Sequence, residues 1–149
     1  MLKIRLTQAY KTLINNIFIN NRIFILILMI YLVLGLLLIY NNYIFFNSDG
    51  ISYLTIALKY FNGNITDAIN GYWGPLFSWL LVPFLYIFGS NPPQSLFADK
   101  ILSLIIGLFT LIGFKTLLYS FGIDKRIINI MLLTLIPEII HFVFYRSCP

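Results

Sequence analysis

The sequence predicts an all-α, polytopic membrane protein with three transmembrane helices, or four, and a helical first loop on the extracytoplasmic side. Of the 149 residues, 60% are hydrophobic and 10% are charged, whereas soluble domains contain about 25% charged residues. The apolar residues also gather in runs long enough to cross a bilayer, separated by short polar segments. Together, these observations predict a multi-pass protein of the cell membrane.

Residues 1–22 form a basic segment with Lys3, Arg5, Lys11 and Arg22 and no acidic residue. Its apolar residues recur near helical spacing, which is typical of a helix on a membrane surface. Its four asparagines weaken such a helix, so a disordered tail is an equal alternative. We therefore predict a cytoplasmic or interfacial N-terminus.

An uninterrupted apolar run, Ile23–Tyr40, predicts the first crossing, which we assign to residues 23–42. At 1.5 Å per residue its 18 residues span about 27 Å, close to the hydrocarbon thickness of a bilayer. A cleaved signal peptide would have a shorter apolar region followed by small residues, whereas bulky residues follow here. Basic residues precede the run and none follows it before Lys59. This bias places the N-terminus in the cytoplasm.

Residues 43–97 are predicted to form an extracytoplasmic loop that contains interfacial helices. The first of these is Ile51–Phe61, whose apolar residues share one helical stripe, and turn residues follow it at Asn62-Gly63-Asn64. The stripe consists of Ile51, Leu54, Leu58 and Phe61.

The segment Leu76–Gly89 is apolar but contains only 14 residues, with Pro83 inside it. This length favours an interfacial or re-entrant helix over a crossing. If the segment did cross, Lys125 and Arg126 would lie outside, against the positive-inside bias. A fourth crossing here is the alternative.

The remainder of the chain is predicted to contain two crossings after a polar turn with two prolines, Ser90–Phe97. Lys115 falls near the inner end of the second crossing, where it can extend to the headgroups. The predicted segments are a second crossing at residues 98–121, a cytoplasmic turn at 122–126, a third crossing at 127–146 and an abrupt C-terminus at 147–149.

Asp49 is the first candidate for chemistry, because it follows the first crossing and precedes Gly50. A substrate or a metal ion could approach it closely there. A carboxylate that is partly screened from water can act as a general base or bind a cation. Ser48 or Asp49 could instead cap the next helix. Position alone leaves both roles open.

Glu138 and His141 are three residues apart in the third crossing and share a helix face. An ionisable group in a membrane segment costs about 2.5–3.5 kcal/mol on insertion scales, so it usually faces protein or water. The two residues are either a cavity-facing pair or a hydrogen-bonded pair that solvates Glu138. A proton relay in a small transporter is a further functional reading of the same pair.

Several polar and aromatic residues have simpler interpretations beside a functional one. Tyr72 and Trp73 could stack on a sugar or anchor the chain at the headgroup level. Asp99 and Lys100 are predicted to anchor the second crossing at the membrane edge. The sequence has no phosphate-binding glycine loop, no serine elbow and no His/Cys metal cluster. Nor does it offer the solvated basic face that nucleic-acid binding requires.

A series of short motifs follows the first crossing in a distinctive order. The motifs are Asp49-Gly50 with Tyr53, Asn62-Gly63, Gly71-Tyr72-Trp73-Gly74-Pro75-Leu76, Ser78-Trp79-Leu80, Phe88-Gly89, Ala98-Asp99-Lys100-Ile101-Leu102-Ser103 and Leu135-Ile136-Pro137. Together they resemble the N-terminal part of membrane glycosyltransferases with the GT-C fold, which include protein O-mannosyltransferases and aminoarabinose transferases. Many members have arginine where Lys100 stands.

This resemblance implies transfer of a sugar from a polyprenyl-phosphate donor, on the extracytoplasmic side, to a lipid, glycan or protein acceptor. Asp49 matches the acidic residue of the family's first outer loop, and so would be catalytic as a base or metal-side carboxylate. Tyr53, Tyr72 and Trp73 would bind the substrate. A divalent metal is the cofactor to test, and the sequence leaves its requirement unknown.

Family members are usually several times longer, and their acidic residue in the loop after the third crossing has no counterpart here. We therefore expect the chain to be truncated and inactive alone, with a missing C-terminal part or a membrane partner completing it. The alternative is a non-catalytic small membrane subunit that binds a larger partner through Ser103, Gly107 and Gly113. A downstream reading frame with more crossings would favour the broken enzyme.

Overall fold

The structure is a computed structural model that describes residues 22–42 and 48–144, with side chains up to residue 140. Every regular element in these ranges is a helix, which confirms the predicted all-α fold class. The helices are α2 (Arg22–Asn42), α3 (Ser48–Phe61), α4 (Ile65–Ala68), α5 (Pro75–Phe88), α6 (Pro92–Ser120) and α7 (Lys125–Phe144). The predicted basic N-terminus, apart from Arg22, and the predicted end at 147–149 lie outside the described residues.

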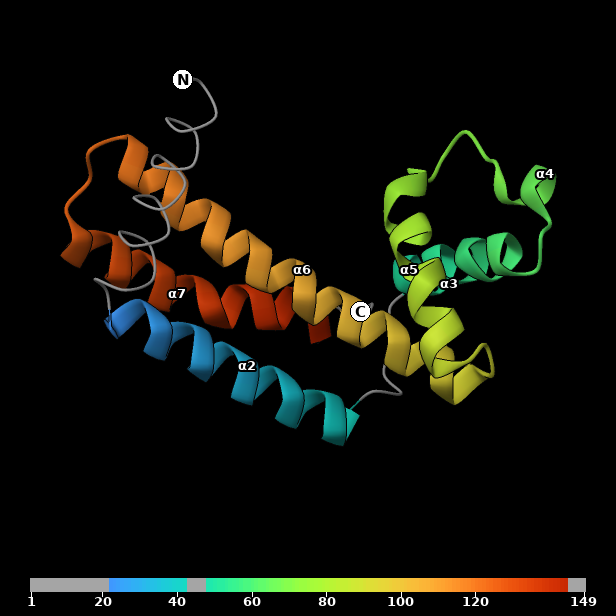
Figure 1. The fold of residues 1–149 in the computed structure, drawn as a ribbon, viewed down its shortest axis with the longest axis horizontal. Coiled ribbons are helices and arrows are strands. Elements are labelled where there is room, and N and C mark those ends of the chain that lie inside the picture. The colour runs from blue at the N-terminus through green and yellow to red at the C-terminus, as the bar shows by residue number, and fades with distance from the viewer. Residues whose placement is uncertain (1–21, 43–47, 145–149) are drawn as a thin grey trace, which may run out of the picture.

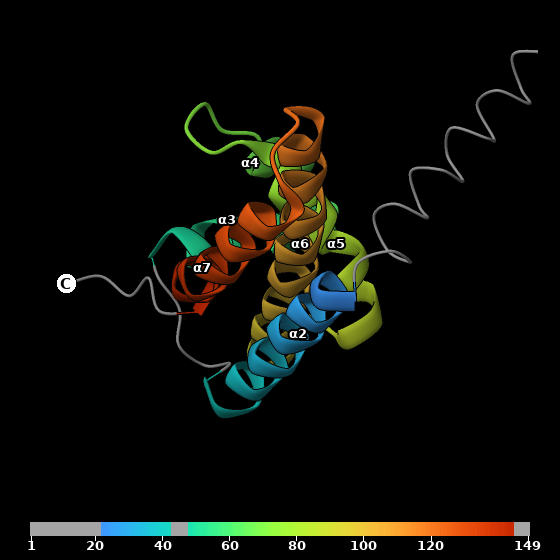
Figure 2. The ribbon, with the colours of Figure 1, turned by 90° about the vertical axis from the view of Figure 1, so that its left-hand side faces the viewer.

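The helices form two packed units that share α6 (Figure 1). In the first unit, called the bundle below, α2 and α7 pack against α6 and against each other. Figure 2, which looks at the bundle from one end, shows both helices beside α6. In the second, called the outer unit, α3 and α5 pack together with α4 beside α3, and the first part of α6 covers them.

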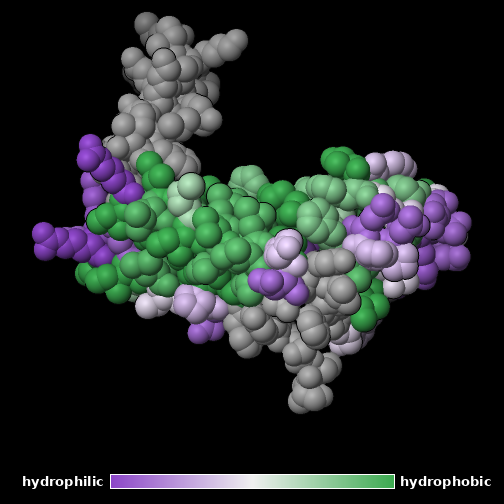
Figure 3. Space-filling model, turned by 90° about the horizontal axis from the view of Figure 1, so that it is seen from below, coloured by the Kyte–Doolittle hydropathy of each residue, from purple (hydrophilic) through white to green (hydrophobic). Residues whose placement is uncertain are grey.

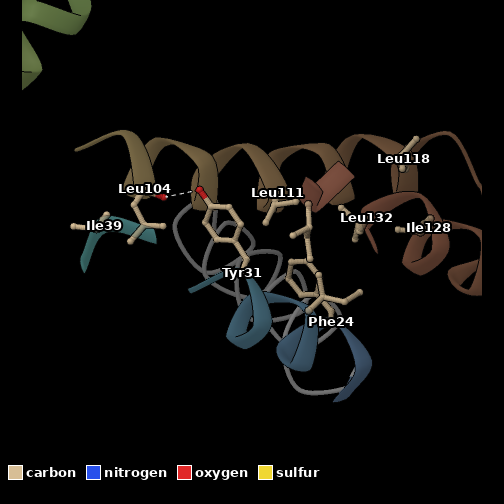
Figure 4. Close-up of a cluster of buried hydrophobic side chains, with 10 residues drawn as sticks. Phe24, Tyr31, Ile39, Leu104, Leu111, Leu118, Ile128 and Leu132 are labelled. Carbon is tan, nitrogen blue, oxygen red and sulfur yellow. Dashed lines mark hydrogen bonds between the residues drawn. The ribbon is translucent and has the colours of Figure 1, made fainter. Parts of the chain in front are cut away.

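The core of the bundle is a continuous row of apolar side chains from all three helices (Figure 4). Its fully buried members include Phe24, Ile27, Tyr31, Leu111, Ile128 and Leu132. The one polar atom that Tyr31 brings into this row is satisfied, because its hydroxyl donates to the carbonyl oxygen of Leu104 at 3.3 Å. A buried hydroxyl without such a partner would be costly.

Two glycines allow α2 and α6 to approach closely. A Cβ atom on Gly107 would overlap the hydroxyl of Tyr31, and one on Gly35 would overlap Leu104. Gly113, by contrast, is exposed and has no neighbour within 4 Å of its Cβ position. Gly107, one of the small residues predicted to pack against a partner, thus packs against Tyr31 within this chain. Contact of these residues with a partner stays a prediction.

Two helices, α2 and α6, are long and apolar enough to cross a membrane. The 29 residues of α6 span about 43 Å, which matches the thickness of a bilayer with its headgroups. Figure 3 shows a broad apolar surface along the bundle between hydrophilic ends. The third crossing, at α7, stays a prediction, as does the cytoplasmic N-terminus.

The start of α6 corrects the predicted polar turn at Ser90–Phe97, because helix α6 already begins at Pro92. Proline is favoured in the first turn, where its missing N–H is not needed and its φ angle suits a helix. The turn is therefore confined to three residues. It opens at Gly89, whose φ of +106° suits glycine and whose Cβ would overlap Gln94.

The core of the outer unit joins α3, α5 and α6 through Leu54, Ala57, Leu81, Leu85, Ala98 and Leu102. Of the predicted stripe on α3, Leu54 is buried in this core, Leu58 and Phe61 pack against it, and Ile51 is exposed. Contact of this stripe with the membrane interface stays a prediction. Helix α5 spans about 21 Å, well short of the hydrocarbon core. It exposes a second apolar stripe on its other side, formed by Leu76, Trp79, Leu80 and Ile87.

Candidate functional site

Asp49 lies in the first turn of α3, exposed to solvent. Helix α3 already includes Ser48, so Asp49 is inside the helix and not at its cap. The hydroxyl of Ser48 donates to the Asp49 carboxylate at 3.5 Å. A carboxylate in the first turn is also favoured by the helix dipole. The backbone of α3 thus places the Asp49 carboxylate at the start of the helix, where the dipole favours it.

Tyr53 follows Asp49 by one helical turn, so the two side chains lie on the same face of α3. The ring of Tyr53 meets Trp73 edge-on, with centroids 5.0 Å apart, and Phe77 at 5.5 Å. Trp73 in turn meets Tyr72 at 4.9 Å. The structure therefore brings together the three residues predicted to bind substrate, and we call Tyr53, Tyr72, Trp73 and Phe77 the aromatic cluster.

The loop before α5 has a local reason to present these rings. The side-chain oxygen of Asn70 accepts the backbone N–H groups of Tyr72 at 3.1 Å and of Trp73 at 2.7 Å. This is the turn that asparagine forms with residues further along its own backbone. Pro75 then begins α5 immediately after Gly74. The turn thus fixes the tyrosine and tryptophan between two short helices.

One hydrogen bond ties the aromatic cluster to both of its helices. The hydroxyl of Ser78 on α5 donates to the backbone carbonyl of Tyr53 on α3 at 2.9 Å. Ser78 is fully buried, so its hydroxyl would be costly to leave without this partner. It fixes the position of α5, and with it the rings of Trp73 and Phe77, relative to α3.

The cluster offers aromatic surface and hydroxyl groups beside a carboxylate. Tyr72 is 84% exposed, so its ring is available to a ligand. Within the described part of the chain, no three His, Cys, Asp or Glu residues lie close enough to hold a metal ion. The arrangement is thus suited to binding a polar ring, with Asp49 as the nearby acid–base group.

Glu138 and His141, the second predicted set, belong to α7 in the bundle. Glu138 is exposed on that helix, while the side chain of His141 lies outside the described residues. Glu138 therefore sits on a different unit from Asp49 and the aromatic cluster. A cavity-facing role for the pair stays a prediction.

Sequence reasoning missed the burial of Asp99 and Lys100. Each is only 5% exposed, and among the described residues Oδ1 of Asp99 has no hydrogen-bond partner. Helix α6 begins about two turns before them, at Pro92, so both residues lie inside the helix and not at its start. Their position at the membrane edge stays a prediction. The paired prolines, taken as a turn, were the signal for this earlier start.

The side chain of Lys115 is also buried, while its predicted position at the headgroups stays a prediction. It is buried in the bundle, and its Nζ lies 3.7 Å from the ring centroid of Phe24 on α2. The ring face attracts the ammonium electrostatically. The charge is therefore held between two helices rather than extended toward solvent.

Comparison of this chain with protein-family models, curated proteins and solved structures finds no match. The resemblance to GT-C glycosyltransferases thus rests on the motifs quoted above. Any function has to be argued from the site itself.

Proposed function

We propose that this chain is a glycosyltransferase-like membrane protein that acts on a polyprenyl-phosphate-linked sugar at the extracytoplasmic face. The observation that carries this proposal is the position of Asp49, one helical turn from the joined rings of Tyr53, Tyr72 and Trp73. Aromatic rings pack on the apolar faces of a sugar, and a carboxylate beside them can accept a proton. The motifs that resemble GT-C enzymes include these same residues.

In this proposal Asp49 acts as the base of a group transfer, or as the carboxylate on the metal side of the site. As a base, it accepts the proton of an acceptor hydroxyl while that oxygen forms a bond to the anomeric carbon. The bond from the anomeric carbon to the phosphate oxygen breaks, and polyprenyl phosphate leaves with the electron pair. The aromatic cluster holds the sugar while this occurs.

In this proposal the two units contact different parts of the donor. The prenyl chain is apolar and belongs in the bilayer, along the surface that the bundle exposes (Figure 3). The sugar belongs at the headgroup level beside the outer unit, where aromatic residues are favoured. Short apolar helices such as α5 suit that depth.

Asp49 is exposed, which has a consequence for activity. Water reaches an exposed carboxylate freely and weakens the electrostatic interactions on which transfer relies. We therefore expect the 149-residue chain to bind the donor but not to transfer its sugar by itself. A membrane partner or further crossings would have to cover Asp49.

Donor binding can be measured by fluorescence, because the chain has two tryptophans and only Trp73 lies in the cluster. In nanodiscs, the Trp79→Phe chain should change its emission as a polyprenyl-phosphate sugar is added. Tyr72→Ala should weaken that binding about tenfold, since an aromatic stacking contact on this scale is worth about 1–3 kcal/mol. Tyr86→Ala, which removes an exposed ring outside the cluster, is the control. Equal affinity in both variants would reject the aromatic site.

A transfer assay tests the role of Asp49 separately. The chain is incubated with labelled polyprenyl-phosphate sugar and with membranes as the acceptor source. No transfer by the purified chain is the expected result. Transfer that disappears with Asp49→Asn would support the catalytic carboxylate and overturn the expectation of inactivity. Transfer that survives Asp49→Asn would reject that role.

One observation favours a second candidate, a non-catalytic subunit that binds a larger membrane partner. Glu138 is exposed on α7 among apolar residues that are also exposed, such as Met131 and Leu133. A carboxylate at such a position usually faces a polar partner. Photo-cross-linking from position 138 in native membranes should then yield one discrete protein adduct, with position 133 as the control. Lipid adducts alone at both positions would count against the subunit.

A further inference from the structure

The turn between α6 and α7 forms an open surface depression with a volume of about 660 Å³, called the hollow below, at the opposite end of the bundle from the aromatic cluster. Ligand pockets commonly measure about 300–1,000 Å³. The hollow lies just beyond the last turn of α6, where the long apolar helix ends. Its lining consists of Tyr119, Gly122, Ile123, Asp124, Lys125 and Arg126.

The charge of this lining is positive. Lys125 and Arg126 are both exposed and contribute two cations. The one acid, Asp124, is turned toward the backbone, because its Oδ1 accepts the N–H of Arg126 at 2.7 Å. Gly122 adopts a φ of +73° and has nothing within 4 Å of its Cβ position, so that side of the turn is open.

The surroundings add further positive charge at this end of the bundle. Arg22 begins α2, whose first turn lies at the same end as the start of α7 (Figure 1). Lys115 lies one turn before Tyr119 on α6, with its ammonium against the ring of Phe24. In Figure 3 this end is hydrophilic next to the apolar surface of the helices. The hollow thus stands where an apolar surface meets a basic one.

This position matches the boundary between acyl chains and headgroups. Lysine and arginine bind phosphate through charge-assisted hydrogen bonds, and basic pockets between membrane helices recognise phosphorylated headgroups. The phenol hydroxyl of Tyr119, which is also exposed, adds a neutral donor. A headgroup bound here would keep its acyl chains beside α6 and α7.

We propose that this hollow binds the phosphate-bearing headgroup of an anionic phospholipid, with Lys125 and Arg126 on the phosphate and Tyr119 as a hydrogen-bond donor. A looser alternative is that these cations only attract the negative membrane surface, as basic segments near crossings do. The headgroup site and the general surface attraction predict different effects of mutation. A site depends on particular side chains, whereas surface attraction depends on the number of charges.

Native mass spectrometry of the full chain released from detergent measures the difference. Phosphatidylglycerol should stay bound as a discrete adduct and phosphatidylcholine should not. Arg126→Gln should weaken phosphatidylglycerol binding about tenfold, because a charge-assisted hydrogen bond is worth about 1.5–3 kcal/mol. Arg22→Gln removes the same charge at the same end but does not line the hollow, so it should change affinity by less than about threefold. Equal losses would overturn the site in favour of surface attraction.

A second variant changes no charge. Tyr119→Phe removes only the hydroxyl and should weaken phosphatidylglycerol binding about threefold, as expected for a neutral hydrogen bond. Tyr40→Phe, on an exposed tyrosine near the other end of α2, is its matched control. An unchanged affinity with Tyr119→Phe would remove that residue from the site. All four positions are exposed, and helical circular dichroism should be unaltered in each variant.

Free phosphate compounds distinguish the source of the ligand. Glycerol 3-phosphate carries the same phosphate without acyl chains. If the ligand is a lipid, glycerol 3-phosphate should displace phosphatidylglycerol only at a large excess. Binding of glycerol 3-phosphate as tight as that of the lipid would overturn the lipid assignment and indicate a soluble phosphate ligand.

Discussion

The bundle and the outer unit bury apolar residues in different ways, although both are built from helices and share α6. The bundle is apolar inside and outside, since Leu26, Val33 and Leu37 are exposed on α2 while Phe24 and Tyr31 are buried. Its helices are held by close contacts at glycines and by the cation–π contact between Lys115 and Phe24. Such a surface is stable beside lipid, where packing rather than water drives helix association.

The outer unit relies instead on directed contacts. Edge-on ring pairs join Tyr53 to Trp73 and Phe77, and the buried Ser78 donates a hydrogen bond to α3. Its own helices, α3, α4 and α5, have at most 14 residues each, fewer than the roughly 20 that a crossing helix usually has. From this difference we expect the bundle to tolerate sequence change on its surface, and the outer unit to depend on particular side chains that also form the candidate site.

The largest effect is expected where the bundle is most closely packed. Gly107→Val should destabilise the chain by about 2 kcal/mol, because the new side chain overlaps Tyr31. Gly113→Val, on the exposed side of the same helix, should change stability by less than about 0.5 kcal/mol. Thermal unfolding in detergent, followed by circular dichroism, compares them. Equal stabilities would contradict the close approach of α2 and α6.

The next effect concerns the buried charge. Phe24→Leu keeps an apolar side chain but removes the ring beside Lys115, and should cost about 1.5 kcal/mol. Phe109→Leu, at an exposed position on α6, is the control in the same unfolding experiment. A loss no greater than that of the control would show that the ammonium does not depend on the ring.

A smaller loss of stability is expected from removing the hydrogen bond that links α5 to α3 in the outer unit. Ser78→Ala removes the hydrogen bond to Tyr53 and should cost about 1 kcal/mol. It should also reduce the near-ultraviolet circular dichroism of the aromatic cluster, because α5 is freed relative to α3. Ser120→Ala removes an exposed hydroxyl that bonds only within its own helix, so neither signal should change. Retention of the cluster signal in Ser78→Ala would contradict the proposed link.

The smallest change in stability is expected when either tryptophan is replaced by phenylalanine. The fluorescence of the remaining tryptophan then reports the depth of α5 in the bilayer. Trp79 is exposed on the apolar stripe of α5, whereas Trp73 is packed in the aromatic cluster. In bilayers with brominated lipids, the Trp73→Phe chain should be quenched strongly by bromines near the headgroup end of the acyl chain. The Trp79→Phe chain should be quenched less. Strongest quenching by bromines at the bilayer centre would favour the fourth crossing.

Much of the fold followed from local properties of the sequence. The hydropathy of residues 23–42 predicted α2 almost to the residue, since a long apolar run without breakers has few alternatives. The span of α5 was likewise predicted within one residue at each end. The start of α6 was not, because two prolines are compatible with both a turn and a first helical turn.

The candidate site likewise combines residues that the sequence singled out with contacts that it did not predict. Asp49, Tyr72 and Trp73 were singled out from position and residue type, and Tyr53 from the resemblance to GT-C glycosyltransferases. Their contacts, however, join residues twenty positions apart, and no local pattern specifies such a distance.

The sequence by itself determined that this chain is helical and, in α2 and α6, apolar enough to cross a membrane, because hydropathy and helix length are properties of a single segment. Only the tertiary structure decided which side chains meet. It buried Asp99 and Lys100, set Lys115 against Phe24, and joined the aromatic rings beside Asp49. Each of these outcomes depends on where a second helix packs, and packing is decided by the shape of both partners.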